Sequence, residues 1–405
     1  MENNKLKDSL KIKPVGIKYL DQYNELLRYV FQVTNQDLQE SGYEDGEIIR
    51  AKRPILKKAE VIGWFHGEQL VSQLCIYPCQ VNIHGKIYQM GGLTGVGTYP
   101  EYTNMGLMNE LIKVGLNKMR NKGQWISYLY PYSVPYYRNK GWEIMSDHMT
   151  FTIKDAQLPK HQDVDGHVER HPIDHEDVIS TYDKFAHASH GAMIRGELEW
   201  DEYWRWENEE ERTAAVYYNS SDEPTGYIMY WIAEDIFHIK EIIYLNQEAR
   251  KGLWNFILAH DSMIDMIKGD IYQNEPIAFL LDDSQITETI EPYFMARIVD
   301  VAAFLENYPF VKKAKPFHFV VTDPIAEWNR GIFGIEWDED KKVNITRNEA
   351  GSPVYIDIKT LTALLMSYRS PAYFYKIEHL KTDAKTLNLL EEIIPKEQPY
   401  FSDYF

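Results

Sequence analysis

Cysteine is scarce in this sequence: only Cys75 and Cys79 occur among 405 residues. On one strand these two positions would share a face about 13 Å apart, which is too far for a disulfide. No run approaches the roughly 18 apolar residues of a membrane span, and the first residues lack the apolar core of a signal peptide. These absences predict a cytoplasmic protein with no structural disulfide and no membrane partner.

Positive charge is also in deficit, because 43 Lys and Arg face 61 Asp and Glu and the formal net charge is −18. A nucleic-acid-binding protein would carry a basic footprint, so we expect no nucleic-acid partner. The acidic balance suits a cationic substrate that is attracted by the long-range field. An acidic surface that serves only solubility explains this net charge equally well.

Apolar residues make up 44% of the sequence and aromatic residues 14%, which is enough for substantial cores. The length predicts two or three domains, and the pattern of elements divides the chain into blocks at 1–155, 156–293 and 294–405. The first block is expected to be α/β. Its first predicted elements are a helix at Tyr19–Phe31 and strands at Val61–Phe65, Leu70–Ile83 and Lys86–Tyr99.

The most informative segment is 94–143, in which a β-rich run ends at Tyr99. A helix is expected next, with Gly106 in its second turn and apolar side chains at helical spacing at Met108, Leu111, Ile112 and Met119. A strand over 125–130 and a short helix over 133–138 follow. A glycine near a helix N-terminus lets the backbone approach a phosphate, which the first N–H groups and the helix dipole attract. The segment therefore predicts a pyrophosphate cradle.

A second copy of this junction is expected in the middle block. The segments 99–112 and 245–258 align without a gap, and Gly106 then matches Gly252. The second copy has Trp254 where the first has Met108, and no Tyr-Arg-x-x-Gly follows its next strand. Because an indole would crowd a coenzyme channel, we expect the second copy to be structural.

Three glycines near the end of the predicted strand suggest a nucleotide loop. Gly92, Gly95 and Gly97 fail the spacing of the dinucleotide motif, however, and no suitable acidic residue follows a second strand. We expect these glycines to relieve crowding where the sheet splays apart.

Two polar segments are weaker candidates for a site. His171, Asp174 and His175 resemble metal-ligand spacing, but their segment is better explained as a solvated helix start. The run 197–212 alternates acidic residues with tryptophans and predicts an amphipathic helix with a charged outer face. Gathering of a cationic substrate is the alternative role for that run.

The order of strand, glycine-containing helix start, second strand and Tyr-Tyr-Arg-Asn-Lys-Gly-Trp at 136–142 resembles the GNAT acetyltransferases. Over its full length the chain is similar to the enhanced-intracellular-survival family, also through VTDPIAEWNRGIFGI at 321–335 and the terminus PYFSDYF. The resemblance implies an α/β (α+β) fold with a catalytic GNAT domain at 1–155, a degenerate GNAT-like domain at 156–293 and a sterol-carrier-like domain at 294–405. It also implies a homohexamer.

Carried over by position, the resemblance implies acetyl-CoA as co-substrate and no metal. Val96, Gly97 and Thr98 would line the pantetheine along a strand edge, and Tyr132 and Ser133 would contact the coenzyme from the splayed next strand. The pyrophosphate would be held by the loop and first helical turn, at Asn104, Met105, Gly106, Leu107, Met108 and Asn109.

The sequence also departs from the pattern of that family. Thr103 stands where a GNAT loop usually begins with Arg or Gln, so phosphate binding would depend on backbone N–H groups. The best-known branch keeps acidic residues in its amine pocket, whereas the equivalents here are Val33 and Tyr404. This difference disfavours an aminoglycoside acceptor more than it disfavours acetyl transfer.

By resemblance, Tyr137 is the general acid and the free α-carboxylate of Phe405 is the base. A thiol has a pKa near 8.5 and a phenol near 10, so proton transfer from tyrosine to a thiolate is uphill by roughly 2 kcal/mol. A terminal carboxylate is a weak base, with a pKa of roughly 3.5, and needs burial or a relay water. Four of the last six residues are aromatic, which predicts a docked chain end rather than a frayed one. We expect Tyr136 in the core, and Tyr130 and Tyr132 along the channel.

The sequence thus predicts an acetyl-CoA-dependent N-acetyltransferase that acts on a primary amine, either an aminoglycoside-like polyamine or a lysine. The alternative is a vestigial transferase whose third block binds a hydrophobic ligand, which Thr103 would favour.

Overall fold

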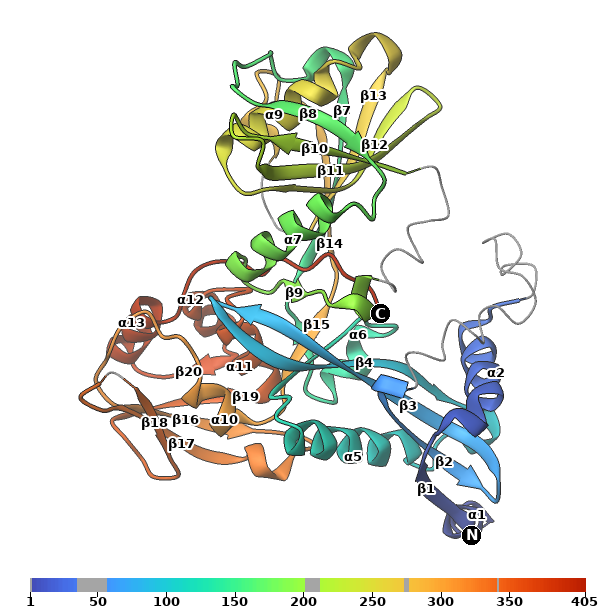
Figure 1. Cartoon of the computed structure of the whole chain (residues 1–405). Helices are drawn as coiled ribbons and strands as arrows, with labels where there is room; N and C mark the ends of the chain where they lie inside the picture. Colours follow the sequence, from blue (N-terminus) through green and yellow to red (C-terminus); the bar gives the residue numbers. More distant parts are fainter. Residues whose placement is uncertain (1, 35–56, 201–211, 273–276, 341) are drawn as a thin grey trace.

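The structure is a computed structural model that describes residues 2–34, 57–200, 212–272, 277–340 and 342–405. Its strands form three sheets of eight, seven and five strands, each with its own helices (Figure 1). In the described ranges, no helix is long and apolar enough to span a membrane. The mixed α+β class that the sequence predicts is confirmed.

The first sheet has the order β1-β2-β3-β4-β5-β15-β6, and β9 pairs with β3. Its strands are β1 (Leu10–Pro14), β2 (Glu60–His66), β3 (Gln69–Ile83), β4 (Lys86–Thr98), β5 (Ile126–Leu129), β6 (Glu143–Ile144), β9 (Met193–Ile194) and β15 (Met295–Ile298). Its helices are α1 (Glu2–Ser9), α2 (Leu20–Phe31), α5 (Leu107–Asn121) and α6 (Val134–Arg138). The elements predicted over 19–99 are confirmed to within one residue.

Helices cover both faces of the first sheet because its central strands are apolar at successive positions. On β3, Cys75 and Tyr77 pack in the cluster that contains α2. Leu74 and Ile76 point to the other face and pack in the cluster that contains α5. Since side chains alternate along a strand, this uninterrupted apolar run is what a sheet with two covered faces requires.

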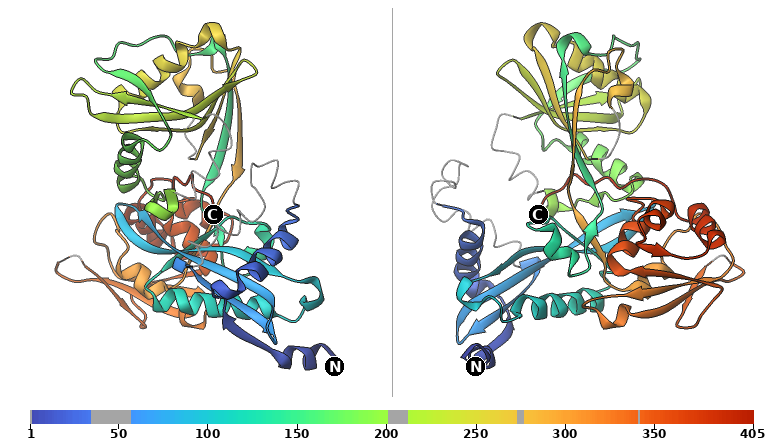
Figure 2. Two further views of the ribbon diagram at one scale, coloured as in Figure 1. Left: turned by 45° about the vertical axis from the view of Figure 1, so that its right-hand side comes forward. Right: turned by 180° about the vertical axis from the view of Figure 1, so that it is seen from behind.

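The second sheet has the order β14-β7-β13-β12-β11-β10-β8. Its strands are β7 (Asp147–Lys154), β8 (His167–His171), β10 (Thr213–Tyr218), β11 (Pro224–Ala233), β12 (Ile236–Tyr244), β13 (Met266–Ile271) and β14 (Thr287–Pro292). Helices α7 (Glu176–Ala188) and α9 (Gln247–Leu258) belong to separate core clusters. Figure 2 shows this sheet set apart from the other two.

The third sheet has the order β18-β17-β16-β19-β20. Its strands are β16 (Phe317–Thr322), β17 (Gly331–Trp337), β18 (Val343–Thr346), β19 (Ser352–Asp357) and β20 (Leu380–Lys381). The helices of this part are α10 (Val301–Glu306), α11 (Ile358–Leu365), α12 (Pro371–Lys376) and α13 (Ala384–Ile393).

Two strands pair in a sheet other than the one formed by the rest of their block (1–155 or 294–405). β7 lies before residue 155 but joins the second sheet, where it pairs with β13 and β14. β15 lies after residue 293 but returns to the first sheet and pairs with β5 and β6. The predicted division at 155/156 and 293/294 stays a prediction, and these two strands are where it departs from sheet membership.

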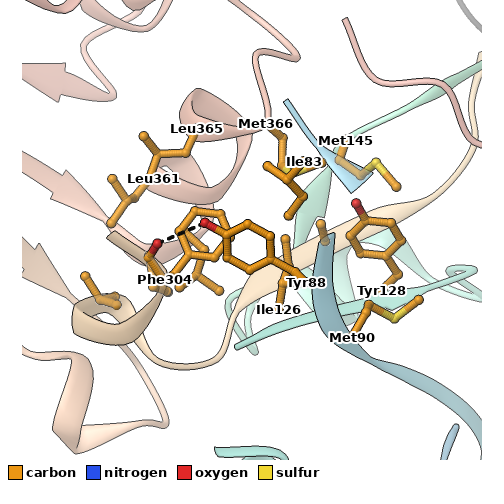
Figure 3. Packing of buried hydrophobic residues seen from close by; sticks show 14 of the residues in the cluster. Ile83, Tyr88, Met90, Ile126, Tyr128, Met145, Phe304, Leu361, Leu365 and Met366 are labelled. Atoms are coloured by element: carbon orange, nitrogen blue, oxygen red, sulfur yellow. Dashed lines mark hydrogen bonds between the residues drawn. The ribbon is translucent and has the colours of Figure 1, made fainter. Parts of the chain in front are cut away.

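The first sheet shares one apolar core with the third sheet and its helices, which we call the first and third parts of the chain. Tyr88 of β4 packs on Phe304 of α10 with ring centroids 5.0 Å apart, and its hydroxyl donates to the Phe304 carbonyl at 3.2 Å (Figure 3). Leu361 and Leu365 of α11 lie in the same cluster as Ile126 of β5. The third part therefore braces the sheet that carries β4 and β5.

A pair of histidines joins all three parts. His84, in the turn between β3 and β4, stacks on His190 with ring centroids 3.5 Å apart. His190 Nδ1 accepts from the His84 N–H at 3.1 Å, and its Nε2 lies 2.9 Å from the Met366 carbonyl. Nδ1 must therefore stay unprotonated. Burial lowers the pKa of His84 to about 4 and the pKa of His190 well below its ordinary value.

This junction should lose stability in acid. Below about pH 6.5 the unfolded chain binds protons on both histidines, whereas the folded chain does not. The free energy of unfolding therefore decreases as the pH is lowered through that range. For His84 alone the loss from neutral pH to pH 5 is about 2 kcal/mol. His84→Asn keeps a side chain that tolerates the positive φ of 50° and removes one titrating group. Denaturant unfolding at pH 7.5 and 5 should give a shallower pH slope for His84→Asn; an unchanged slope would contradict this assignment.

Candidate functional site

A cavity of about 930 Å³ lies where β4 and β5 separate. Its walls come from α2, β4, the loop before α5, the first turn of α5, the segment from β5 to α6, and the chain end. Its lining residues are Val30, Phe31, Leu93, Thr94, Gly95, Val96, Gly97, Thr98, Tyr102, Thr103, Asn104, Gly106, Leu107, Met108, Asn109, Tyr130, Tyr132, Ser133, Tyr136, Tyr137, Lys140, Tyr404 and Phe405.

The cavity exists because two neighbouring parallel strands stay paired over only a short length. β4 and β5 pair from Met90–Ile126 to Gly92–Tyr128, and beyond Gly92 no further pairing is formed between them. β4 itself continues to Thr98 against β3, with a bulge that places Gly95 and Val96 opposite a single residue of β3. A bulge bends its strand and increases its twist. The edge of β4 beyond Gly92 therefore faces the cavity instead of another strand.

Glycines keep this opening clear. A side chain on Gly92 would meet the Phe405 ring at 2.9 Å, and one on Gly97 would meet Val30 at 3.1 Å. Gly95 has a φ of +60° at the bulge, a conformation in which glycine is favoured. The prediction that these glycines relieve crowding in the splayed sheet is confirmed.

The N-terminus of α5 opens onto the cavity without a side-chain cap. Gly106 is its N-cap residue, with φ +74°, and no side chain bonds the first N–H groups of the helix. Asn104 also has a positive φ, of 61°. The prediction that Gly106 lies in the second helical turn is therefore wrong: two left-handed residues cannot belong to a right-handed helix, and they turn the chain into it instead. The N–H groups of Leu107, Met108 and Asn109 have no partner within the helix.

The corresponding helix of the second sheet has a different start. The N-cap of α9 is Asn246, and its side-chain oxygen accepts from the Ala249 N–H at 2.8 Å. Gly252 lies inside α9, where a side chain would meet the Tyr217 ring at 2.1 Å. The gapless match of Gly106 to Gly252 is thus wrong in register, because the two glycines occupy different helical positions. Trp254 is a buried core residue of this part.

Tyr137 reaches the cavity from α6, a short helix with Pro135 in its first turn. Its side chain is only 7% exposed, and its ring packs against Tyr136 at 5.2 Å and Trp142 at 6.3 Å between centroids. Among the described residues its hydroxyl has no hydrogen-bond partner. Burial, followed by a smaller contribution from Tyr136, raises the pKa of the Tyr137 phenol, so it stays protonated at neutral pH.

The chain end docks into the same cavity, as its aromatic composition predicts. The Phe405 ring packs on Phe294 at 5.3 Å and on Tyr77 at 6.0 Å between centroids. Tyr404 packs on Tyr130 at 5.1 Å. The terminal residue is therefore held among aromatic rings rather than frayed.

The structure brings together all the predicted site residues except one. Met105 does not line the cavity and packs instead beside the core cluster of α5. Tyr132 and Ser133 line it from the loop after β5 rather than from a strand, because β5 ends at Leu129. Tyr136, expected in the core, is half-buried and lines the cavity.

Several lining residues were not predicted from the sequence. Val30 and Phe31 come from the last turn of α2, and Lys140 follows α6. Lys140 lies 5.1 Å from the Tyr136 ring centroid, and burial lowers its pKa. The only local signal for Phe31 was its position near the end of an amphipathic helix, which does not distinguish a site residue from a packing one.

The two weaker candidates have a structural explanation where they are described. His175 is the N-cap of α7 and accepts from the Asp177 N–H at 3.3 Å, which confirms the predicted helix start. No cluster of three metal-ligand side chains occurs in the part of the chain that the structure covers. Most of the run 197–212, with Trp204 and Trp206, lies outside the described residues.

Comparison with known sequence families finds three matches. Residues 11–145 and 191–298 each match an acetyltransferase (GNAT) domain, and residues 301–402 match a sterol carrier protein domain. Among curated protein sequences, none matches this chain.

Solved structures resemble the chain over nearly its full length. A protein of Enterococcus faecalis V583, described as a probable N-acyltransferase, is 29% identical with a TM-score of 0.87, and 98% of this chain covers 99% of that one. A GCN5-related N-acetyltransferase from Anabaena variabilis is 24% identical, with a TM-score of 0.82 and coverage of 98% and 100%. Eis1 from Mycobacterium abscessus is 16% identical, with a TM-score of 0.80 and coverage of 98% and 100%. The last two likenesses concern the fold alone.

Proposed function

Because this chain consists of two GNAT acetyltransferase domains followed by a sterol carrier protein domain, we propose that it is an acetyl-CoA-dependent N-acetyltransferase of primary amines. One observation carries the proposal: the open N-terminus of α5, the Tyr137 hydroxyl and the end of the chain all border one cavity. A diphosphate binder, a proton donor and a carboxylate are the three groups that the reaction needs.

The coenzyme fits the cavity along β4. Its diphosphate lies at the first turn of α5, where free N–H groups and the helix dipole stabilise negative charge. The positive φ of Asn104 and Gly106 turns the chain into α5, whose first N–H groups carry no side-chain cap. The pantetheine follows the open edge of Val96, Gly97 and Thr98, because an amide-containing chain can form the hydrogen bonds of the missing strand. Because Thr103 stands where the loop usually begins with Arg or Gln, no arginine side chain at that position contributes to this binding.

The thioester end lies near the aromatic chain end. The amine nitrogen attacks the thioester carbonyl carbon, and a backbone N–H of the open β4 edge beyond Gly92 stabilises the oxygen of the tetrahedral intermediate. Collapse breaks the carbon–sulfur bond and forms the amide. The Phe405 carboxylate, directly or through a water, removes the proton of the amine, and Tyr137 gives a proton to the departing sulfur.

Burial of Tyr137 changes the energetics of that last step. A higher phenol pKa makes complete transfer to a thiolate more costly than the roughly 2 kcal/mol expected for an ordinary tyrosine. The phenol therefore acts best as a hydrogen-bond donor whose proton moves while charge is still growing on sulfur, since donors aimed at developing charge are most effective in a water-poor site.

The acceptor part of the cavity is aromatic. Among the described residues that line the cavity, no side chain is acidic, and Phe31, Tyr130, Tyr132 and Tyr404 are all at least 45% exposed. Phe31 and Tyr132 form an edge-to-face pair with ring centroids 6.5 Å apart. Such rings attract an ammonium group through their faces and bury an apolar body. The acceptor is therefore an amine carried on an aryl or alkyl group rather than a polycation.

The alternative role as a hydrophobic-ligand protein receives less support. Phe304 of the sterol carrier domain packs on Tyr88 of β4, and Leu361 lies in the same apolar cluster (Figure 3). These apolar side chains are thus part of a core shared with the first sheet.

Gly106→Ala tests the coenzyme site. The substitution puts a side chain in front of the open N–H groups and strains a left-handed residue, so acetyl-CoA binding should weaken about tenfold or more. Gly123→Ala is the matched control: this glycine follows the same helix, has a φ of +72° and is surrounded by open space. Calorimetry should show normal binding for the control; equal losses in both variants would refute the cradle.

Tyr137→Phe tests the proton donor. Turnover should fall by about 10²- to 10⁴-fold, the usual contribution of a positioned acid, while acetyl-CoA still binds. Tyr128→Phe removes a hydroxyl from a fully buried tyrosine that does not line the cavity and should retain normal rates. The turnover of both variants is measured from the thiol that the reaction releases. Full activity of Tyr137→Phe would exclude this residue from the mechanism.

Acceptor preference can be measured directly with defined amines. Phenethylamine and tryptamine should give a kcat/KM at least about tenfold above that of kanamycin, because a polycation would meet aromatic rings and Lys140 and, among the described lining residues, no acidic side chain. Kanamycin as the better substrate would reject the aromatic-acceptor assignment but leave acetyl transfer intact.

A further inference from the structure

The last residues of the chain are buried although they form no helix or strand. Tyr400, Phe401, Ser402 and Asp403 are each at most 6% exposed. A chain end usually frays unless specific contacts hold it. Aromatic packing explains Phe401, but it does not explain why a carboxylate at Asp403 is taken out of water.

Asp403 is bonded to an arginine from a distant part of the chain. Arg195, just after β9, donates from Nε to Asp403 Oδ1 at 2.7 Å, and its Nη2 donates to Ser402 Oγ at 3.1 Å. The same Nη2 donates to Glu241 Oε1 of β12 at 3.2 Å. The Arg195 side chain is fully buried, as are both carboxylates to within 3%.

Further contacts leave the arginine and the tail little freedom. The guanidinium carbon lies 3.7 Å from the Tyr182 ring centroid and 4.6 Å from that of Trp200. The Tyr182 hydroxyl donates to Asp403 Oδ2 at 3.1 Å, and the Tyr293 hydroxyl donates to the Asp403 carbonyl at 3.1 Å. Ser402 Oγ donates to Glu241 at 2.7 Å. We call Arg195, Glu241, Ser402 and Asp403 the tail clamp.

Stability alone is a poor reason for this cluster. Two carboxylates and one guanidinium are desolvated together, and such buried ionic groups can often be replaced by apolar residues with no loss of stability. Arg195 and hydrogen bonds hold the pKa of Glu241 below its ordinary value against the effect of burial, whereas burial outweighs Arg195 and raises the pKa of Asp403. What the clamp does supply is a fixed position for Asp403.

That position limits where the chain can end. Two residues span at most about 7 Å, so a fixed Asp403 confines the α-carbon of Phe405 to a small region of the cavity wall. The Phe405 ring on Phe294 and the Tyr404 ring on Tyr130 then select its direction. We propose that Arg195 is a positioning residue for the reaction, acting through Asp403 to hold the terminal carboxylate at the acceptor amine. This inference rests on the proposed function.

The purely structural explanation is that Arg195 only joins the second GNAT domain to the tail. The two explanations differ in whether Arg195 acts through the free carboxylate. A double-mutant cycle separates them, because effects that share one target are not additive. The first change is Arg195→Lys, whose ammonium lacks the fork that reaches Asp403 and Glu241 together. The second is a Gly-Ser extension after Phe405, which turns the terminal carboxylate into an amide.

In the native-length chain, Arg195→Lys should lower kcat/KM about 10- to 100-fold, the usual effect of a reacting group displaced by about 1 Å. In the extended chain, which has already lost the carboxylate, the same substitution should lower kcat/KM less than about twofold. Equal losses in both chains would overturn the positioning role. Asp403→Asn, close in shape to the native residue, repeats the cycle in case Arg195→Lys does not fold.

A second measurement does not depend on catalysis. Carboxypeptidase A removes an aromatic terminal residue once the tail is released, and mass spectrometry detects the loss of Phe405. Arg195→Lys and Asp403→Asn should accelerate this removal about tenfold or more. The matched control is Tyr217→Phe, which removes a hydrogen bond to Glu248 in the same domain but outside the tail clamp; it should resemble the wild type in both measurements. Equal resistance of Phe405 to removal in all variants would show that the tail clamp does not hold the chain end.

Failure of the two proposals would be distinguishable. If the extended chain keeps the full rate, the terminal carboxylate is not the base and the proposed mechanism fails at that step. If the extension abolishes activity but Arg195→Lys has no effect on rate, the mechanism stands and the inference about Arg195 is wrong.

Discussion

The separation of β4 from β5 after Gly92 is the constraint on which the rest of the site depends. Had the two strands stayed paired, the edge of β4 would be covered by β5, and neither a coenzyme nor the Phe405 ring could lie against it. The bulge at Gly95 and Val96 bends the strand, and the absence of a side chain on Gly92 admits the terminal ring. The α5 N-terminus and Tyr137 then face the same opening because they follow β4 and β5 along the chain.

Features set by local sequence were predictable. The strands and α5 follow from apolar periodicity, and the docked chain end follows from four aromatic residues in its last six. Periodicity did not reveal that α5 begins after Gly106, because the left-handed conformation of Asn104 is a property of one residue rather than of a pattern. The resemblance, not the periodicity, placed Tyr132 and Ser133 on the next strand, whereas β5 ends at Leu129 and both residues lie in the segment after it.

Features set by contacts across the chain were not predictable. Arg195 and Asp403 are 208 positions apart, and the two histidines of the junction are 106 apart. No spacing in the sequence relates such residues, and the sequence neighbours of each would lead one to expect a surface charge or a turn residue. The gapless alignment that revealed the internal repeat matched Gly252 to Gly106, but the helix starts lie six residues out of that register.

The second GNAT domain shows how a duplicated unit can lose one property and still determine the site. Asn246 caps α9 with its own side chain, so the helix N–H groups that stay open in the first domain, where we propose a phosphate binds, are partly satisfied within the second. The same domain contributes Arg195 and Glu241, the buried charges that hold the tail of the third domain. Desolvating these charges is costly, and an apolar contact would join the domains at least as well. An ionic contact differs from an apolar one chiefly in direction, because a guanidinium fork donates its hydrogen bonds to carboxylates only at fixed angles. Under the mechanism we propose, the terminal carboxylate has to meet an amine, so direction matters, and that requirement would give the degenerate domain a reason to remain in the chain.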